Sequence, residues 1–222
     1  RCFTREELTA IGRLAERHGL GILSDEIWSE IVYAPAGFTS MLALDEAIAS
    51  RTVVVHGFSK SFGLAGLRIG YVAVRDAAVS ARMLAASEHP STVDGAATVS
   101  QIGAAAAYDH ALPWLGAFID HLRARRDQAT EALNAMPGVH VHSPDATYVA
   151  FAKISDPPST IEDLVDRLRC QHGVAVVPGS PRWFGEGAAG HLRVCFATSE
   201  GILREGLDRM ARGISALRSS MA

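Results

Sequence analysis

The stretch that decides the fold is residues 56–70, HGFSKSFGLAGLRIG, in which Lys60 lies in a turn rich in serine and glycine. An apolar, β-branched run at residues 52–55 precedes it, and a second strand-like run follows at residues 69–74. Arg68 comes eight positions after the lysine. A lysine at the exit of a strand, beside flexible glycines and a cation, predicts a reactive amine next to an anion site.

The composition is that of a globular protein. Of the 222 residues, 48% are apolar, which is enough to bury a core in one large domain or two small ones. The net charge of −3, without a basic block, argues against nucleic acid as a partner. No apolar run approaches the roughly 20 residues that span a bilayer, so we expect no membrane partner. Cys2, Cys170 and Cys195 lack disulfide or metal spacing, which is typical of reduced thiols in a cytoplasmic protein, and no metal is expected.

Helices and strands alternate through the first part of the chain. Thr4 and Glu7 form a predicted capping box for a helix that stops at Gly19. A short strand at residues 20–23 follows and leads to Asp25, as the strand before residue 56 leads to the lysine turn. This pattern predicts an α/β sheet, and ligands of such sheets bind beyond the carboxyl ends of the strands.

The pattern changes in the second part of the chain. After an alanine-rich helical region that we expect to break around Pro90, a charged helix begins at Pro113 and connects to shorter elements. A last amphipathic helix is capped by Ser199. We therefore predict two domains, residues 1–112 and residues 113–222, the second ending in a small α+β unit.

The candidate residues suit one kind of chemistry. A lysine amine forms a Schiff base with a carbonyl, and the hydroxyls of Ser59 and Ser61 with the guanidinium of Arg68 suit a phosphate. A phosphorylated aldehyde held by Lys60 is therefore the hypothesis, and pyridoxal phosphate is the common compound of this kind. Its ring nitrogen must stay protonated, which a carboxylate favours, and Asp25 is the candidate.

Three segments carry a resemblance to a known family: residues 24–28, SDEIW; residues 57–70; and residues 190–197, GHLRVCFA. The chain resembles, over essentially its whole length, the C-terminal part of a fold-type I pyridoxal-phosphate enzyme of the class I/II aminotransferase superfamily. The resemblance implies that residues 1–112 are the second half of a large cofactor-binding domain with a mixed, mostly parallel sheet. Residues 113–222 would be a connecting helix and a small C-terminal α+β domain.

The resemblance also implies a role for each candidate residue. Lys60 would form the internal aldimine and then move the proton, and Asp25 would pair with the pyridinium nitrogen. Arg68 would bind the cofactor phosphate, while Arg193 would bind the α-carboxylate of the substrate as a bidentate partner.

Two positions depart from the family pattern. Trp28 stands where the family often has a tyrosine that donates to the ring oxygen of the cofactor, and an indole N–H donates but is no acid. Gly57 stands where a serine often helps to hold the phosphate. Ser59 or His56 is the candidate to compensate.

Members of the family are nearly twice as long, so the resemblance implies that this chain is a fragment without an N-terminal half. Removing half of a sheet should leave open strand edges and an exposed apolar face. We therefore expect the missing half, or a complementary chain, as a partner. For the complete protein the resemblance implies a cytoplasmic homodimer.

Three functions remain open from the sequence. The first is an aminotransferase acting on an amino acid and a 2-oxo acid, which the segment at residues 58–68 favours. The second is a pyridoxal-phosphate carbon–sulfur β-lyase of the cystathionine β-lyase-like subgroup, which residues 27–30 and 187–199 also resemble. The third is an inactive structural fragment.

Overall fold

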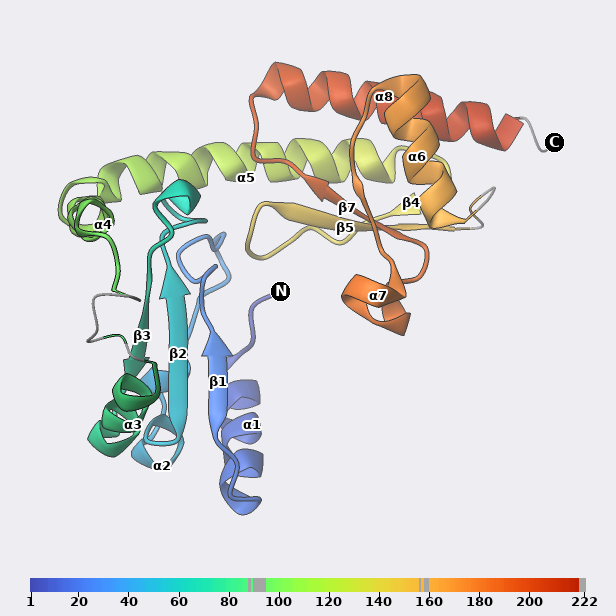
Figure 1. Cartoon of the computed structure of the whole chain (residues 1–222). Coiled ribbons are helices and arrows are strands. Elements are labelled where there is room, and N and C mark those ends of the chain that lie inside the picture. Colours follow the sequence, from blue (N-terminus) through green and yellow to red (C-terminus); the bar gives the residue numbers. More distant parts are fainter. Residues whose placement is uncertain (88, 90–94, 156, 158–159, 220–222) are drawn as a thin grey trace. The chain divides into compact units, whose positions relative to one another are not determined.

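The computed structural model describes residues 1–87, 89, 95–155, 157 and 160–219 (Figure 1). The chain divides into two compact units, residues 1–119 and residues 120–222, each of which is described by itself. The dividing point lies inside helix α5 (Leu112–Asn134), slightly after the expected boundary at residue 112. The assignment of residues 1–112 and 113–222 to two functional domains stays a prediction.

The first unit contains a three-stranded sheet in the order β1-β2-β3 (Figure 1). Strand β1 runs parallel to β2, and β2 runs antiparallel to β3. The sheet is therefore mixed, as the sequence predicts. The elements of this unit before α5 are α1 (Arg5–Arg17), β1 (Ile22–Asp25), α2 (Glu46–Ala49), β2 (Thr52–Gly57), β3 (Gly70–Val74), α3 (Ala77–Ser87) and α4 (Thr98–His110).

Local sequence signals explain the first helix. The hydroxyl of Thr4 accepts a hydrogen bond from the Glu7 amide at 3.2 Å, and the Glu7 carboxylate accepts one from the Thr4 amide at 2.9 Å. The predicted capping box is thus confirmed. On its inner face, Leu8 packs with Ile22 of β1 against a small core that includes Ile48 of α2.

The helical region after β3 is two helices, α3 and α4. The break expected around Pro90 lies outside the described residues. Helix α4 buries Ala104 and Ala107 in a core with Phe58, Phe62 and Leu115. This core holds the segment that follows β2.

The second unit is an α+β arrangement around a four-stranded antiparallel sheet in the order β4-β5-β7-β6. Along β5 and β7 the buried residues alternate with exposed ones, as expected for a sheet with one covered face. Its elements after α5 are β4 (Val139–His140), β5 (Val149–Ile154), α6 (Ile161–His172), β6 (Val177–Pro178), α7 (Pro181–Phe184), β7 (His191–Cys195) and α8 (Glu200–Ser219).

The covered face of this sheet and the two last long helices form one core. Leu164 and Leu168 of α6 are fully buried, and α8 contributes Leu207, Met210 and Ile214. Within the described residues, no helix is both long and apolar enough to cross a membrane.

Candidate active site

The lysine turn follows directly after β2. Phe58 and Phe62, at its two ends, are only 4% and 7% exposed, because both pack against α4 and the start of α5. Between these anchors, Ser59 and Lys60 are half-buried. The turn is further closed by the Leu64 amide, which donates to the Phe58 carbonyl at 3.1 Å. Buried aromatics therefore fix the turn and leave the lysine accessible.

Lys60 lies against an aromatic ring and not against a carboxylate. Its Nζ is 5.1 Å from the centroid of the Trp28 ring, a cation–π distance. No salt bridge to Lys60 is found among the described residues. The whole sequence contains only one other lysine, Lys153, which donates to the Ala189 carbonyl at 2.7 Å in the second unit.

Asp25 is the last residue of β1, and it is exposed. It pairs in register with Val55 of the parallel strand β2, whose carboxyl end leads to Lys60. The Ile27 amide donates to Asp25 Oδ1 at 3.1 Å, which holds the carboxylate in an Asx turn. Parallel strands end at the same edge of a sheet, so the carboxylate and the lysine turn share that edge.

Arg68 has an unusual backbone conformation. Its φ of 49° and ψ of 44° place it in the left-handed region, at the end of a short 3₁₀ turn, Ala65–Leu67. Ser100 of α4 holds this turn, since its hydroxyl donates to the Leu67 carbonyl at 2.7 Å. The Arg68 side chain is exposed, and no carboxylate in the described part of the chain forms an ion pair with it. An exposed guanidinium of this kind is able to bind an anion.

Arg193 lies in the second unit, on the exposed face of β7. Its guanidinium carbon is 5.8 Å from the centroid of the Phe184 ring, and its cross-strand neighbour on β5 is Phe151. Phe151 in turn stacks on His191 with centroids 4.7 Å apart. Two phenylalanine rings thus lie beside the arginine.

Ser61 and His56 are buried and bind the side chain of Glu30. Ser61 is fully buried, and its hydroxyl donates to Glu30 Oε2 at 2.6 Å. His56 is 6% exposed, and its Nε2 lies 3.0 Å from the same oxygen. The structure gives no support to Ser61 as a phosphate ligand, or to His56 as a replacement for the hydroxyl absent at Gly57, because both bind the partly buried Glu30 carboxylate. Ser59 and Arg68 remain the candidates.

This carboxylate is the centre of a set of side chains that we call the Glu30 network: Glu30, His56, Ser61, Tyr71 and Tyr108. The Tyr108 hydroxyl donates to Glu30 Oε1 at 3.3 Å, and the hydroxyls of Tyr108 and Tyr71 are 3.3 Å apart. Sequence reasoning missed this network. Tyr108 is 78 positions from Glu30, so no local pattern could have signalled the contact.

Burial and hydrogen bonding oppose each other at Glu30. Partial burial alone would raise the pKa of its carboxyl, but the hydrogen bonds from His56 and Ser61 outweigh it and hold that pKa below its ordinary value. The pKa of the Tyr108 hydroxyl is strongly raised, first by burial and then by its bond to Tyr71. The carboxylate is therefore the charged member of the network, and Tyr108 is a neutral donor.

Two glycines bring β2 and β3 close together beside the network. Gly57 and Gly70 face each other in the antiparallel pair. A Cβ atom on Gly70 would lie 2.5 Å from the His56 carbonyl oxygen, whereas one on Gly57 would be 3.4 Å from the Ile69 carbonyl oxygen. The absence of a side chain at Gly70 is thus a packing requirement.

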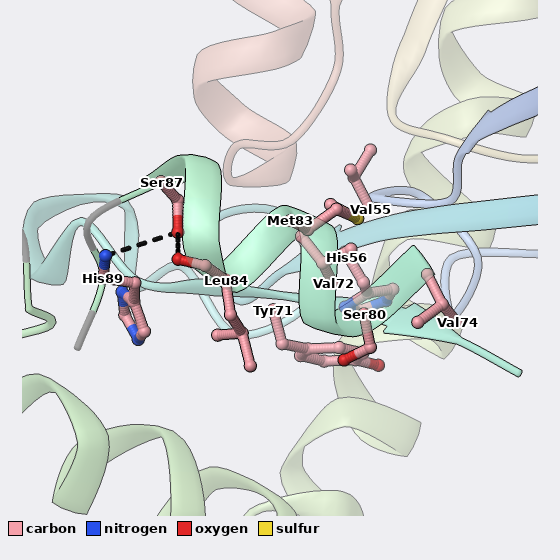
Figure 2. A pocket seen from close by; sticks show the side chains of 11 residues that line it. Val55, His56, Tyr71, Val72, Val74, Ser80, Met83, Leu84, Ser87 and His89 are labelled. Carbon is pink, nitrogen blue, oxygen red and sulfur yellow. Dashed lines mark hydrogen bonds between the residues drawn. The ribbon is translucent and has the colours of Figure 1, made fainter. Parts of the chain in front are cut away.

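A cavity of about 620 Å³ lies between β2, β3 and α3 (Figure 2). Most of its lining is apolar, with Val72 from the sheet and Met83 and Leu84 from the helix. His56 and Tyr71 stack at its wall with centroids 5.0 Å apart. The described residues that line it include no lysine or arginine, so it is a poor site for an anion. No group of three potential metal ligands is found in the described part of the chain.

The chain that carries these candidate residues was compared with known protein families. A family model described as aminotransferase class I and II matches residues 1–210. The chain belongs to this family. The resemblance inferred from the sequence is therefore confirmed.

Individual members of the class I and II aminotransferase family are similar to this chain, but only over about half of their own length. The aspartate aminotransferase of Bacillus sp. (strain YM-2) is 29% identical over 215 residues, which are 95% of this chain and 53% of that protein. The aromatic aminotransferase of Pyrococcus horikoshii OT3 superposes with a TM-score of 0.87 at 29% identity, covering 97% of this chain and 57% of that structure. This chain spans about half the length of the curated relatives it matches.

A more distant structure has the same fold. Cystalysin from Treponema denticola, in a crystal structure that contains a pyridoxal 5′-phosphate cofactor, superposes with a TM-score of 0.90 at 18% identity. The superposition with cystalysin covers 98% of this chain and 55% of that structure. The predicted α/β class, with part of a mixed-sheet domain followed by a small α+β unit, is confirmed. The roles of Lys60, Asp25, Trp28, Ser59, Arg68 and Arg193 stay predictions.

Proposed function

We propose that the protein containing this chain is a pyridoxal-phosphate-dependent aminotransferase that passes an amino group between an amino acid and a 2-oxo acid. The observation that carries the proposal is the position of Lys60. This lysine, one of two in the chain, is accessible on a turn fixed by buried aromatics, at the same sheet edge as the exposed Asp25. Membership of the aminotransferase family supports it.

The side chains at this edge fit the cofactor in charge and type. The carboxylate of Asp25 suits a protonated ring nitrogen, and the exposed guanidinium of Arg68 suits a phosphate. The Ser59 hydroxyl, on the same turn as the lysine, would donate a second hydrogen bond to the phosphate. Trp28 offers an aromatic face at 5.1 Å from the lysine amine, with an indole N–H as its one polar group.

Pyridoxal phosphate, when bound, supplies an electron sink for the bond that breaks at the substrate Cα. Lys60 would anchor it through Nζ and afterwards move the proton at the Cα. Asp25 would keep the ring nitrogen protonated, and Arg68 with Ser59 would fix the phosphate. Arg193 would orient the substrate by binding its α-carboxylate.

The supporting partners belong to the same proposal. We infer that the complete protein supplies an N-terminal half to this site, works as a homodimer and is cytoplasmic. The support is the family resemblance and the match to only about half of each relative. Sedimentation of the complete protein measures the dimer directly.

The test is covalent trapping on the complete protein. Incubation with pyridoxal phosphate, reduction with borohydride and peptide mapping should give one adduct at Lys60. Lys60→Ala should lose the adduct and the activity, whereas Lys153→Ala, the matched control at the other lysine, should keep both. Absence of an adduct in the unaltered protein would reject the proposal.

The cosubstrate requirement separates the aminotransferase from the carbon–sulfur lyase. An aminotransferase turns over an amino acid continuously only when a 2-oxo acid is present. Release of pyruvate and ammonia from cystathionine without an added oxo acid would contradict the aminotransferase assignment and identify the lyase. A protein that is trapped at Lys60 yet inactive in both assays would also contradict it.

A further inference from the structure

The Glu30 network has no part in the proposed chemistry, yet it surrounds the segment that carries the catalytic lysine. The Glu30 side chain is 23% exposed, and the His56 ring beside it is 4% exposed. Burying a carboxylate costs free energy unless hydrogen bonds compensate. A partly buried carboxylate beside the lysine turn therefore needs a structural explanation.

The geometry gives one, because a single oxygen binds residues on either side of Lys60 along the chain. Glu30 Oε2 is 3.0 Å from Nε2 of His56, four positions before Lys60, and 2.6 Å from the hydroxyl of Ser61, one position after it. An ionised carboxylate only accepts hydrogen bonds, so the shared proton lies on Nε2. The lysine therefore lies within a short segment, residues 56–61, whose first and last side chains bind the same oxygen atom.

The other carboxylate oxygen ties the turn to α4. Tyr108 donates to Glu30 Oε1, and its ring packs edge-on against Phe58 and Phe62 at centroid distances of 5.1 and 5.7 Å. Tyr71 of β3 stacks on the His56 ring, and its hydroxyl lies 3.3 Å from the hydroxyl of Tyr108. Strand β2, helix α4 and the turn thus meet at one carboxylate, and β3 contacts its partners His56 and Tyr108.

Trp28, two positions before Glu30, supplies the ring against which the Lys60 amine lies. The same short segment therefore contacts the lysine directly and holds the turn on which the lysine lies. A displacement of this segment would move both. Reacting groups displaced by about 1 Å lose up to roughly a hundredfold in rate.

We propose that Glu30 is a positioning residue, which sets the place of the Lys60 amine by binding His56 and Ser61, one on either side of Lys60 along the chain. The inference rests on the proposed function, since it concerns the reach of Lys60 toward the cofactor aldehyde. Glu30 itself does not touch the reacting atoms in this account.

The experiment compares Glu30→Ala, Glu30→Gln and Ser61→Ala in the complete protein, with Glu131→Gln on the exposed face of α5 as the control. Glu30→Ala should lower kcat by about 10- to 100-fold while the amino-acid KM changes less than about threefold, because binding is kept and alignment is lost. Glu30→Gln should recover part of the rate, since its amide oxygen still accepts from Ser61. Glu131→Gln should behave as the unaltered protein.

Two further measurements do not depend on turnover. In the cofactor-free protein, amide hydrogen exchange of residues 56–64 should speed up in Glu30→Ala and Ser61→Ala. The rate at which borohydride traps pyridoxal phosphate on Lys60 should fall in parallel with kcat. A merely structural role would lower the unfolding midpoint without lowering this trapping rate in the folded protein.

The outcomes separate this inference from the proposed function. An unaltered protein that is trapped at Lys60, with Glu30→Ala and Ser61→Ala trapped equally fast, overturns the positioning role alone. An unaltered protein that is not trapped overturns the proposed function, and the positioning role with it. Where Glu30→Ala fails to fold, Ser61→Ala decides, because it removes one hydrogen bond at 2.6 Å and leaves the carboxylate in place.

Discussion

At the scale of single residues, Glu30 accepts hydrogen bonds from a strand, a turn and a helix. Its partners His56, Ser61 and Tyr108 lie on β2, on the lysine turn and on α4. Partial burial raises the pKa of the carboxyl, but the hydrogen bonds from His56 and Ser61 outweigh it and hold that pKa below its ordinary value of 4.5. Because unfolding frees the carboxyl from these bonds, its proton affinity rises in the unfolded chain.

This difference predicts an acid-sensitive contribution to stability. Below the ordinary pKa of 4.5 the unfolded chain binds more protons at Glu30 than the folded protein does, so stability falls as the pH falls. The contribution is complete above the unfolded pKa and is lost as the pH drops through the folded pKa. Glu30→Gln should therefore remove part of the acid dependence of the unfolding free energy.

Urea unfolding of the complete protein at a series of pH values between about 3 and about 6 measures this effect. The exposed Glu131→Gln is the control and should keep the acid dependence of the unaltered protein. Parallel stability curves for Glu30→Gln and the unaltered protein would contradict the prediction.

Sequence reasoning at this scale reached the residues that lie in local patterns. Lys60, Asp25 and Arg68 each follow a strand or turn that can be read from a few neighbours. It gave no sign of the hydrogen bond from Ser61 to the partly buried Glu30, because the two residues are 31 positions apart. The roles of buried polar side chains depend on long-range contacts, which no local pattern contains.

At the scale of elements, the β2–β3 pair depends on the small size of Gly70. The hypothetical Cβ atom at this position would lie 2.5 Å from a backbone oxygen of the neighbouring strand, and a backbone atom cannot turn aside. The two strands would have to separate beside His56, which belongs to the Glu30 network. The lysine turn, which connects these two strands, would be disturbed as well.

Gly70→Ala should therefore destabilise the complete protein by about 1–3 kcal/mol, the usual cost of forcing an extra methyl group into a closely packed place. Gly66→Ala is the matched control, since no atom lies within 4 Å of its hypothetical Cβ and its φ is not positive. Urea unfolding should show a lower midpoint for Gly70→Ala and little change for Gly66→Ala. Equal midpoints would mean that the strands can separate without cost.

Most elements could be predicted from their ends. Thr160 caps α6 by accepting from the Asp163 amide, and Gly173 ends that helix with a φ of 66°, as such residues usually do. Strand β6 covers only Val177–Pro178, although the apolar run in the sequence begins at residue 174. Its extent depends on pairing with β7, which a run of apolar residues alone does not reveal.

At the scale of the whole molecule, the three-stranded sheet has open sides. In the described part of the chain, β1 and β3 each pair only with β2. Leu23 on β1 is 71% exposed, and Val72 on β3 is 50% exposed. Unpaired strand edges with exposed apolar side chains favour association with other chains.

We therefore expect residues 1–222, produced alone, to form oligomers or aggregates, while the complete protein stays in defined particles. Analytical ultracentrifugation with urea unfolding measures both properties. A monomeric chain of residues 1–222 with a single cooperative transition would contradict this expectation.

The presence of only two lysines gives this chain an unusual cleavage pattern. A protease that cuts only after lysine divides the denatured chain at Lys60 and Lys153, which yields the segments 1–60, 61–153 and 154–222. A side chain that carries a reduced cofactor is no longer a substrate for such a protease. Occupancy of Lys60 would then leave the first two segments joined as residues 1–153, so that a simple gel band reports whether the Lys60 amine is modified.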